Sequence, residues 1–343
     1  MNSLAKNMQA FKRIAKGAIL QDLCPKGMGV STKEILKVSN LDKRYGEKKV
    51  VNEISFDVKR GEILCFLGPN GAGKSTTINI LCGILGYHSG EIKYNDKNVK
   101  ECLNEFKQKL GVVPQELAIY EDLSAEQNVR FFASLYGLKG KELAEKTERA
   151  LEFVGLTDRK KEKASTYSGG MKRRLNIACA IAHEPELLIM DEPTVGIDPQ
   201  SRNHILSSIK KLSKNGMTIL YTTHYMEEVE EISTRILIMD NGSIIAEGTK
   251  ESLKEDIFDE RQFIIELEEA ADLNTDAFYK VEGVKRIEKK DKNLVITSLK
   301  NVENLDKIIA IIIESRSKML NLFCRTASLE NVFLKLTGKS LRD

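Results

Sequence analysis

The chain has 343 residues and a formal net charge of +3, from 53 basic and 50 acidic residues. Hydrophobic residues make up 41% and charged residues 30%, which is typical of a folded globular protein and excludes a disordered or fibrous one. The near balance of charge disfavours nucleic-acid binding. The longest apolar runs, such as Ile308–Ile313, are far shorter than the roughly 18 to 20 residues that span a bilayer, so the chain is not expected to be a channel or a permease.

The cysteines and histidines show no pattern of metal ligands or disulfide pairs. The six cysteines include no CxxC pair, and the four histidines lie far apart in the sequence. We therefore expect no disulfide framework and no zinc site, and a reducing compartment is favoured. The N-terminus has no sustained apolar core and no small-residue cleavage site, so no secretory signal is expected.

Residues 1–33 differ in character from the rest of the chain. Met1–Leu20 contains basic but no acidic residues, and its apolar residues fall on one helical stripe opposite the basic ones. One interpretation is an amphipathic helix that lies on a membrane surface or on a membrane-protein partner. The other is an unstructured tail, which is favoured because Gly17 and the short length weaken an isolated helix.

From Ile35 onward strands and helices alternate, which predicts an α/β fold. Leu187–Met190 is a short apolar run, typical of a strand buried on both faces of a parallel sheet. Ser124 and Gln127 have the spacing of a capping box and predict the start of a helix. The expected strands span 35–38, 50–58, 63–67, 187–190, 218–222 and, as an edge strand, 243–247, and further helices are expected over 76–85 and 141–154.

A phosphate-binding loop follows the strand that ends at Leu67. The pattern G-x-x-x-x-G-K-[ST] lies between a predicted strand and a predicted helix, which is the context that this motif requires. Its glycines let successive N–H groups point at phosphate oxygens, and the following helix adds its positive end. Lys74 can neutralise the β- and γ-phosphates, and Ser75 can ligate Mg²⁺. The predicted nucleotide-binding residues here are Gly68, Pro69, Asn70, Gly71, Ala72, Gly73, Lys74, Ser75 and Thr76.

A second acidic motif ends the strand 187–190, where Asp191 and Glu192 reach the carboxyl edge of the sheet. Asp191 is predicted to hold Mg²⁺, and Glu192 to orient or deprotonate the water that attacks the γ-phosphate. His224 follows another strand of the same expected sheet and can contact a phosphate oxygen or that water. The alternatives are a solvated acidic turn and a structural histidine.

The segment Tyr167-Ser168-Gly169-Gly170-Met171 opens a helix about twenty residues before Asp191. It resembles the signature loop of ABC-type ATPases. Other segments resemble further motifs of that family in the same order. These are the A-loop aromatic residue Tyr45, the Q-loop glutamine Gln115, the D-loop Gly196–Pro199 and the switch histidine His224.

The resemblance implies a role for each of these residues. Tyr45 would stack on adenine, and Gln115 would join Ser75 and Asp191 at the metal. Two cassettes would close head to tail around ATP, so that Ser168, Gly169 and Gly170 contact the γ-phosphate bound to the partner. A Ser-Gly-Gly turn at a helix N-terminus is consistent with that role, because it is an anion-binding end. Lys74, Glu192 and His224 would be the catalytic groups.

The resemblance also implies a P-loop NTPase fold of the ABC cassette type, with a mixed sheet core and a helical subdomain at about 117–175. We expect the cassette to span 34–252, after the extension 1–33. The basic run Lys172–Arg174 within it has two interpretations, a contact with the membrane subunit and a solvated face, of which the solvated face is favoured.

The pattern of residues 253–343 predicts a separate accessory domain of the α+β class. The order is strand 262–268, helix 275–281, strands 284–288 and 294–298, helix 302–314, strand 319–325 and helix 329–336. This order suggests a split βαβ core. No glycine-rich phosphate loop occurs here, so we expect a regulatory or assembly role.

Tyr167, Met171 and the tail 327–337 resemble the drug- and peptide-resistance exporters, whose membrane subunits are separate chains. The predicted function is ATP binding and hydrolysis that powers export of a drug, peptide or lipid-like substrate. The expected partners are a second cassette, forming a homodimer, and a polytopic permease, with the chain peripheral on the cytoplasmic face of the membrane. ATP and Mg²⁺ are the expected cofactors, and no nucleic-acid partner is expected. The alternative is a soluble ABC ATPase that acts on nucleic acid or ribosomes.

Overall fold

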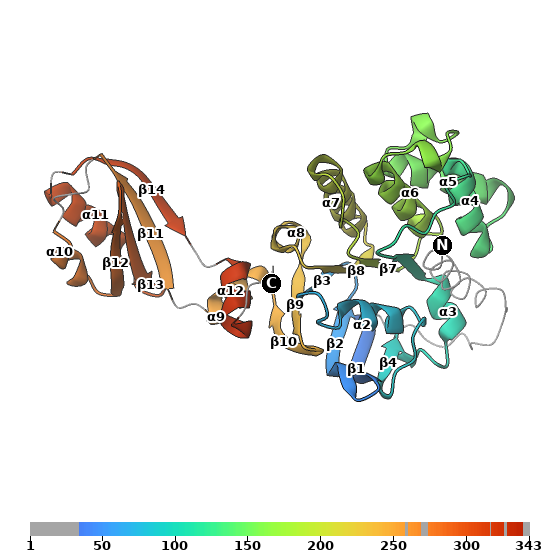
Figure 1. Cartoon of the computed structure of the whole chain (residues 1–343), viewed down its shortest axis with the longest axis horizontal. Helices are drawn as coiled ribbons and strands as arrows, with labels where there is room; N and C mark the ends of the chain where they lie inside the picture. The colour runs from blue at the N-terminus through green and yellow to red at the C-terminus, as the bar shows by residue number, and fades with distance from the viewer. Residues whose placement is uncertain (1–33, 258–259, 269–273, 316, 326–327, 339–343) are drawn as a thin grey trace. The chain divides into compact units, whose positions relative to one another are not determined.

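The computed structural model describes residues 34–257, 260–268, 274–315, 317–325 and 328–338 (Figure 1). They form two compact units that divide between Thr249 and Lys250. The expected boundary after residue 252 therefore falls inside α9, Lys250–Ile257, which belongs to the second unit. The amphipathic helix considered for residues 1–20 lies outside the described residues. No helix in the described ranges is both long and apolar enough to cross a bilayer.

The first unit contains an antiparallel sheet of four strands, in the order β2-β1-β4-β5. Its apolar residues, such as Val38, Leu41 and Val58, are buried. The strands are β1 Glu34–Tyr45, β2 Lys48–Lys59, β4 Ser89–Tyr94 and β5 Lys97–Asn98.

The second sheet of this unit has six strands in the order β10-β9-β3-β8-β7-β6. All pairs are parallel except β10 with β9, so the sheet is mixed and β10 is an antiparallel edge strand, as predicted. Every residue of β3, β7 and β8 is buried, which confirms that their apolar runs are covered on both faces. The strands are β3 Ile63–Leu67, β6 Leu110–Val113, β7 Leu187–Asp191, β8 Thr218–Thr223, β9 Arg235–Asp240 and β10 Ser243–Gly248.

Helices of the first unit pack on this sheet and on one another. Helix α2, Lys74–Leu81, ends four residues before the predicted end at 85, because Gly83 adopts the left-handed φ of 69° that terminates a helix. The capping box of Ser124 and Gln127 is confirmed at α4. Helices α4, α5 and α6 pack together as a helical subdomain (Figure 1). The remaining helices are α3 Leu103–Gln108, α4 Ala125–Leu135, α5 Gly140–Phe153, α6 Gly169–Ile181, α7 Pro199–Lys214 and α8 Met226–Ile232.

The second unit has the predicted order of elements. Its antiparallel sheet runs β12-β13-β11-β14, so β13 separates β11 from β12 in a split βαβ arrangement. Residues of α10 and α11 cover one face of this sheet around Phe263 and Ile296 (Figure 1). The last helix, α12, packs against α9. The elements are β11 Glu260–Leu267, α10 Asp276–Tyr279, β12 Val284–Lys290, β13 Asn293–Leu299, α11 Leu305–Glu314, β14 Met319–Arg325 and α12 Leu329–Thr337.

Candidate nucleotide-binding site

The loop Gly68–Ser75 joins β3 to α2 and has the backbone curvature of a phosphate cradle. Gly71 and Gly73 have φ angles of 83° and 102°, which L side chains rarely adopt. A Cβ at Gly73 would lie 2.6 Å from the carbonyl oxygen of Val50, so no larger residue fits there. The loop leads directly into the N-terminus of α2, which places the positive end of the helix at the same site.

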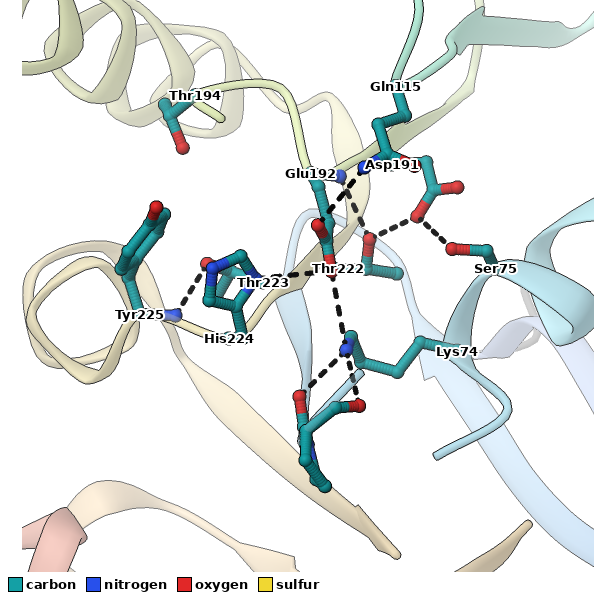
Figure 2. Close-up of polar contacts among 12 residues, drawn as sticks. Lys74, Ser75, Gln115, Asp191, Glu192, Thr194, Thr222, Thr223, His224 and Tyr225 are labelled. Carbon is teal, nitrogen blue, oxygen red and sulfur yellow. Dashed lines mark hydrogen bonds and ion pairs between the residues drawn. The ribbon is translucent and has the colours of Figure 1, made fainter. Parts of the chain in front are cut away.

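Lys74 is buried at the start of α2, with 4% of its surface exposed. Its Nζ donates hydrogen bonds to the carbonyl oxygens of Gly68 at 2.7 Å and Pro69 at 3.1 Å, and it forms an ion pair with Glu192 Oε1 at 3.3 Å (Figure 2). Burial lowers the pKa of the ammonium group, and the neighbouring carboxylates oppose that shift. The lysine thus holds its ammonium group against the loop that is expected to bind phosphate.

Ser75 and Asp191 meet at the carboxyl edge of the sheet. Ser75 Oγ donates to Asp191 Oδ1 at 3.1 Å, and Thr222 Oγ1 donates to the same oxygen at 2.6 Å. Burial raises the pKa of Asp191, whereas these two hydroxyl donors lower it. A hydroxyl and a carboxylate so close together supply the hard oxygen atoms that Mg²⁺ prefers, so the residues present fit that ion.

Glu192 is the residue on which the other predicted groups converge. Its carboxylate lies 3.3 Å from Lys74 Nζ and 3.4 Å from His224 Nδ1, and Gln115 Nε2 donates to Oε2 at 3.4 Å (Figure 2). Its φ is 43°, an uncommon left-handed conformation for a residue other than glycine. The backbone N–H donates to Thr222 Oγ1 at 3.0 Å, which supports this conformation.

Gln115 contacts this group through its amide nitrogen, which faces Glu192. Its predicted role as a metal ligand requires the amide oxygen instead, and that role stays a prediction.

Tyr45 and the signature turn, which we define as Ser168–Gly170, lie elsewhere. Among the described residues neither of them hydrogen-bonds to the Glu192 carboxylate. The Tyr45 ring is 51% exposed, with Lys43 Nζ 5.2 Å from its centroid, so one face can accept a stacked base. Ser168 caps α6 and accepts from Met171 N at 3.3 Å. Their predicted roles, stacking on adenine for Tyr45 and contact with a nucleotide bound to the partner for the signature turn, stay predictions.

Two residues that support the site were not identified from the sequence. Thr222 links Asp191 to Glu192, and its only signal was a hydroxyl residue near the end of a predicted strand. Arg173 was wrongly interpreted as part of a solvated basic run. It is 4% exposed, and its guanidinium donates to the carbonyl oxygens of Pro114 at 2.8 Å and Gln115 at 2.6 Å. Burial lowers its pKa to about 10, so it stays charged and fixes the backbone that carries Gln115.

Comparison with known proteins agrees with this geometry. The family model described as ABC transporter matches residues 51–195. A linearmycin resistance ATP-binding protein of Bacillus subtilis is 43% identical over 320 residues, which cover 90% of this chain and 100% of that protein. A Nod factor export ATP-binding protein of Ralstonia nicotianae is 32% identical and covers 93% of this chain and 98% of its own.

Solved structures give the same result. The cassette cbiO1 from Clostridium perfringens, part of an ABC transporter complex, has a TM-score of 0.61 at 31% identity, over 66% of this chain and 92% of that one. A dimeric cassette bound to ADP and phosphate has a TM-score of 0.57 at 25% identity, over 62% of this chain and 98% of that one.

The fold and the site therefore define a P-loop ATPase of the cassette type, which confirms the predicted fold class. The chain belongs to the ATP-binding subunits of ABC transporters, and it binds and hydrolyses ATP. These relatives favour a transport ATPase over the alternative that acts on nucleic acid or ribosomes.

Proposed function

We propose that this chain is the ATPase subunit of an antibiotic exporter, which works as a homodimer on the cytoplasmic face of the membrane with a separate polytopic permease. The observation that carries the catalytic part is the convergence of Lys74, Gln115 and His224 on the Glu192 carboxylate, beside the Ser75–Asp191 pair. The export part is supported by the relatives, one named for linearmycin resistance and another for Nod factor export.

The contacts of Glu192 support a role as general base. Phosphate oxygens held by Lys74 and the loop backbone would compete with Glu192 for the same ammonium group. The carboxylate is then left to accept a proton from water or to orient it. His224, which contacts the same carboxylate oxygen as Lys74, would hold that water or a γ-phosphate oxygen in line.

Ser75 and Asp191, with Gln115, would hold Mg²⁺. When bound, this ion neutralises the charge that develops on the transferred phosphoryl group. Asp191 is prepared for that role by Ser75 and Thr222, whose hydroxyl groups orient its carboxylate.

The signature turn supports the dimer. Ser168–Gly170 forms the N-terminus of α6, with Ser168 as cap, and the 13 residues of the helix align their dipoles toward it. Because the turn does not reach the Glu192 cluster of its own chain, its anion-binding end is available for a nucleotide held by a second copy.

A tagged chain purified from membranes tests the export proposal. We expect a polytopic membrane protein to co-purify, and we expect loss of the gene to make cells more sensitive to an amphiphilic antibiotic. The wild-type gene should restore resistance, whereas the Glu192→Gln gene should not, because it retains binding but not turnover. Recovery of the chain with ribosomes or nucleic acid, and unchanged sensitivity, would contradict the proposal.

A further inference from the structure

A buried carboxylate outside the predicted site gathers several hydroxyl groups around it. Glu228 of α8 is fully buried. Its oxygens accept hydrogen bonds from Thr194 Oγ1 at 2.5 Å, from the Tyr221 hydroxyl at 2.8 Å and from Thr223 Oγ1 at 2.8 Å. Arg202 Nε completes the shell as an ion-pair partner at 3.6 Å. None of these residues was singled out from the sequence.

The donors come from segments that carry the proposed catalytic groups. Thr194 lies two residues after Glu192, and Thr223 directly precedes His224. Arg202 lies in the first turn of α7, whose N-terminal cap is Asp198. Glu228 therefore joins three segments that are separate in the sequence and meet at the carboxyl edge of the sheet.

Thr223 connects Glu228 to the backbone of the switch histidine. Its hydroxyl donates to Glu228 Oε2. It also accepts from the backbone N–H of Tyr225 at 3.0 Å, as Figure 2 shows. It therefore ties together the residues on both sides of His224. The Tyr225 ring lies 4.1 Å from the His224 ring, and the Arg202 guanidinium lies 4.7 Å from the Tyr225 ring. Partners of Glu228 thus hold both the backbone around His224 and, through the Tyr225 ring, its side chain.

The start of α7 also contacts the signature turn. A Cβ at Gly170 would lie 2.1 Å from Ser201 Oγ, so the Ser201 side chain packs directly against the glycine and no larger residue fits there. Ser201 precedes Arg202, the ion-pair partner of Glu228. The same contacts thus extend from the signature turn to His224 within one chain.

Burying a carboxylate among this many fixed partners has a large desolvation cost. Apolar residues of similar size often stabilise a core equally well, so stability alone does not account for Glu228. The hydrogen bonds of Glu228 are better explained by the fixed positions that they give to the neighbouring segments. We propose that Glu228 is a positioning residue for ATP hydrolysis, which holds His224 and the segment after Glu192 in a fixed relation through Thr223 and Thr194 and ties both to the start of α7. This inference rests on the proposed role of His224.

Substitutions at Thr223 in the full chain test the proposal. Thr223→Val keeps the shape and removes the hydroxyl, and Thr223→Ser restores the hydroxyl. We expect Thr223→Val to lower kcat for Mg-ATP by about 10- to 100-fold, the loss typical of a misplaced catalytic group. The Kd for ATP should change by less than about two-fold, because the phosphate loop is untouched. Thr223→Ser should recover most of the rate.

Thr218→Val is the matched control. Thr218 is buried in the same strand β8, and its hydroxyl accepts from Gly61 N at 3.1 Å at the other end of the strand. It should lower the thermal unfolding temperature as much as Thr223→Val does and leave kcat unchanged. Glu228→Gln, which keeps the size and removes the charge, is the second test variant and should also lower kcat at constant Kd for ATP.

The outcomes distinguish the positioning role of Glu228 from the proposed role of His224. A wild-type kcat in Thr223→Val, together with a low kcat in His224→Ala, would reject the positioning role and leave the proposed function standing. A wild-type kcat in His224→Ala would reject the role of His224 itself. Equal losses of kcat in Thr223→Val and Thr218→Val would show a merely structural effect, and so would a failure of Thr223→Ser to restore the rate. If Thr223→Val does not fold, a wild-type kcat in Glu228→Gln rejects the proposal.

Discussion

The two compact units differ in which kinds of polar residue they bury. In the first unit, one group of buried ionisable side chains lies around the ends of β7 and β8, where Lys74, Asp191, Glu192 and Glu228 all have partners. In the described part of the second unit, the buried polar residues are neutral, namely Thr297, Ser298 and Asn304, and the core around Phe263 is apolar. Burying charge is costly, so it persists where it has a use. The proposed chemistry thus lies in the first unit, and the core of the second unit is held by apolar packing.

The largest effect is expected from Glu192→Gln, which keeps the size of the side chain and removes its charge. ATP binding should survive, because the loop backbone, Lys74 and Mg²⁺ recognise the phosphates. Hydrolysis should fall by about 10²- to 10⁴-fold, the range for loss of a general base. Phosphate release measures the rate, and size-exclusion chromatography with Mg-ATP should show the trapped dimer. Turnover at the wild-type rate would make His224 the first candidate for the base.

Lys74→Ala should act on binding instead of turnover. Removing one partner of a buried charge pair weakens binding by about 2–5 kcal/mol, and the substitution also leaves Glu192 buried without its ion-pair partner. Isothermal titration with ATP measures the loss, and no closed dimer should form. If Lys74→Ala bound ATP as tightly as the wild type, Lys74 would not be a phosphate ligand. Its burial would then not mark the first unit as the one that carries the chemistry.

Ile308→Ala tests whether the second unit is held by apolar packing alone. Ile308 is fully buried in α11 against the sheet, so truncation should lower the free energy of unfolding of this unit by about 2–5 kcal/mol. Ile313→Ala is the control on the same helix, because Ile313 is 69% exposed and should change stability by less than about 0.5 kcal/mol. Hydrogen exchange of β11 and β13 measures the effect, while ATP affinity should not change. A parallel loss of ATP affinity would show that the two units are coupled.

The smallest effect concerns a partly buried titratable group in the first unit that lies away from the site. His183 stacks on Tyr136 with ring centroids 3.5 Å apart, and its Nε2 contacts the Leu110 carbonyl oxygen at 3.2 Å. Burial lowers its pKa to about 3. The unfolded chain takes up this proton near pH 6.5. The free energy of unfolding should therefore fall as the pH drops from about 6.5 toward 3, by at most about 2 kcal/mol at pH 5.

His183→Gln should remove that part of the acid sensitivity, and His204→Gln, at an exposed position, should not. Urea unfolding of both variants at pH 7.5 and pH 5 measures the difference. Equal pH dependence in the wild type and in His183→Gln would show that this histidine is not held neutral.

The sequence alone determined the phosphate loop, the strands on either side of the acidic pair and the order of elements in the second unit. Each of these depends on neighbours along the chain: glycines between a strand and a helix, apolar runs that end in carboxylates, and alternation that predicts strands. The positions of Asp191 and His224 were predictable for the same reason, because the carboxyl ends of parallel strands meet at one edge of a sheet.

Only the tertiary structure decided which side chains meet. Ser75 and Asp191 are 116 residues apart in sequence, and their contact depends on the order β3-β8-β7. The contacts of Thr222 and Glu228 depend on that order, since hydroxyl and carboxylate residues occur throughout the sequence and no local pattern marks these two. Arg173 was predicted wrongly because a basic run does not show which of its side chains faces the interior. Contacts between distant segments arise from packing, and local periodicity carries no information about them.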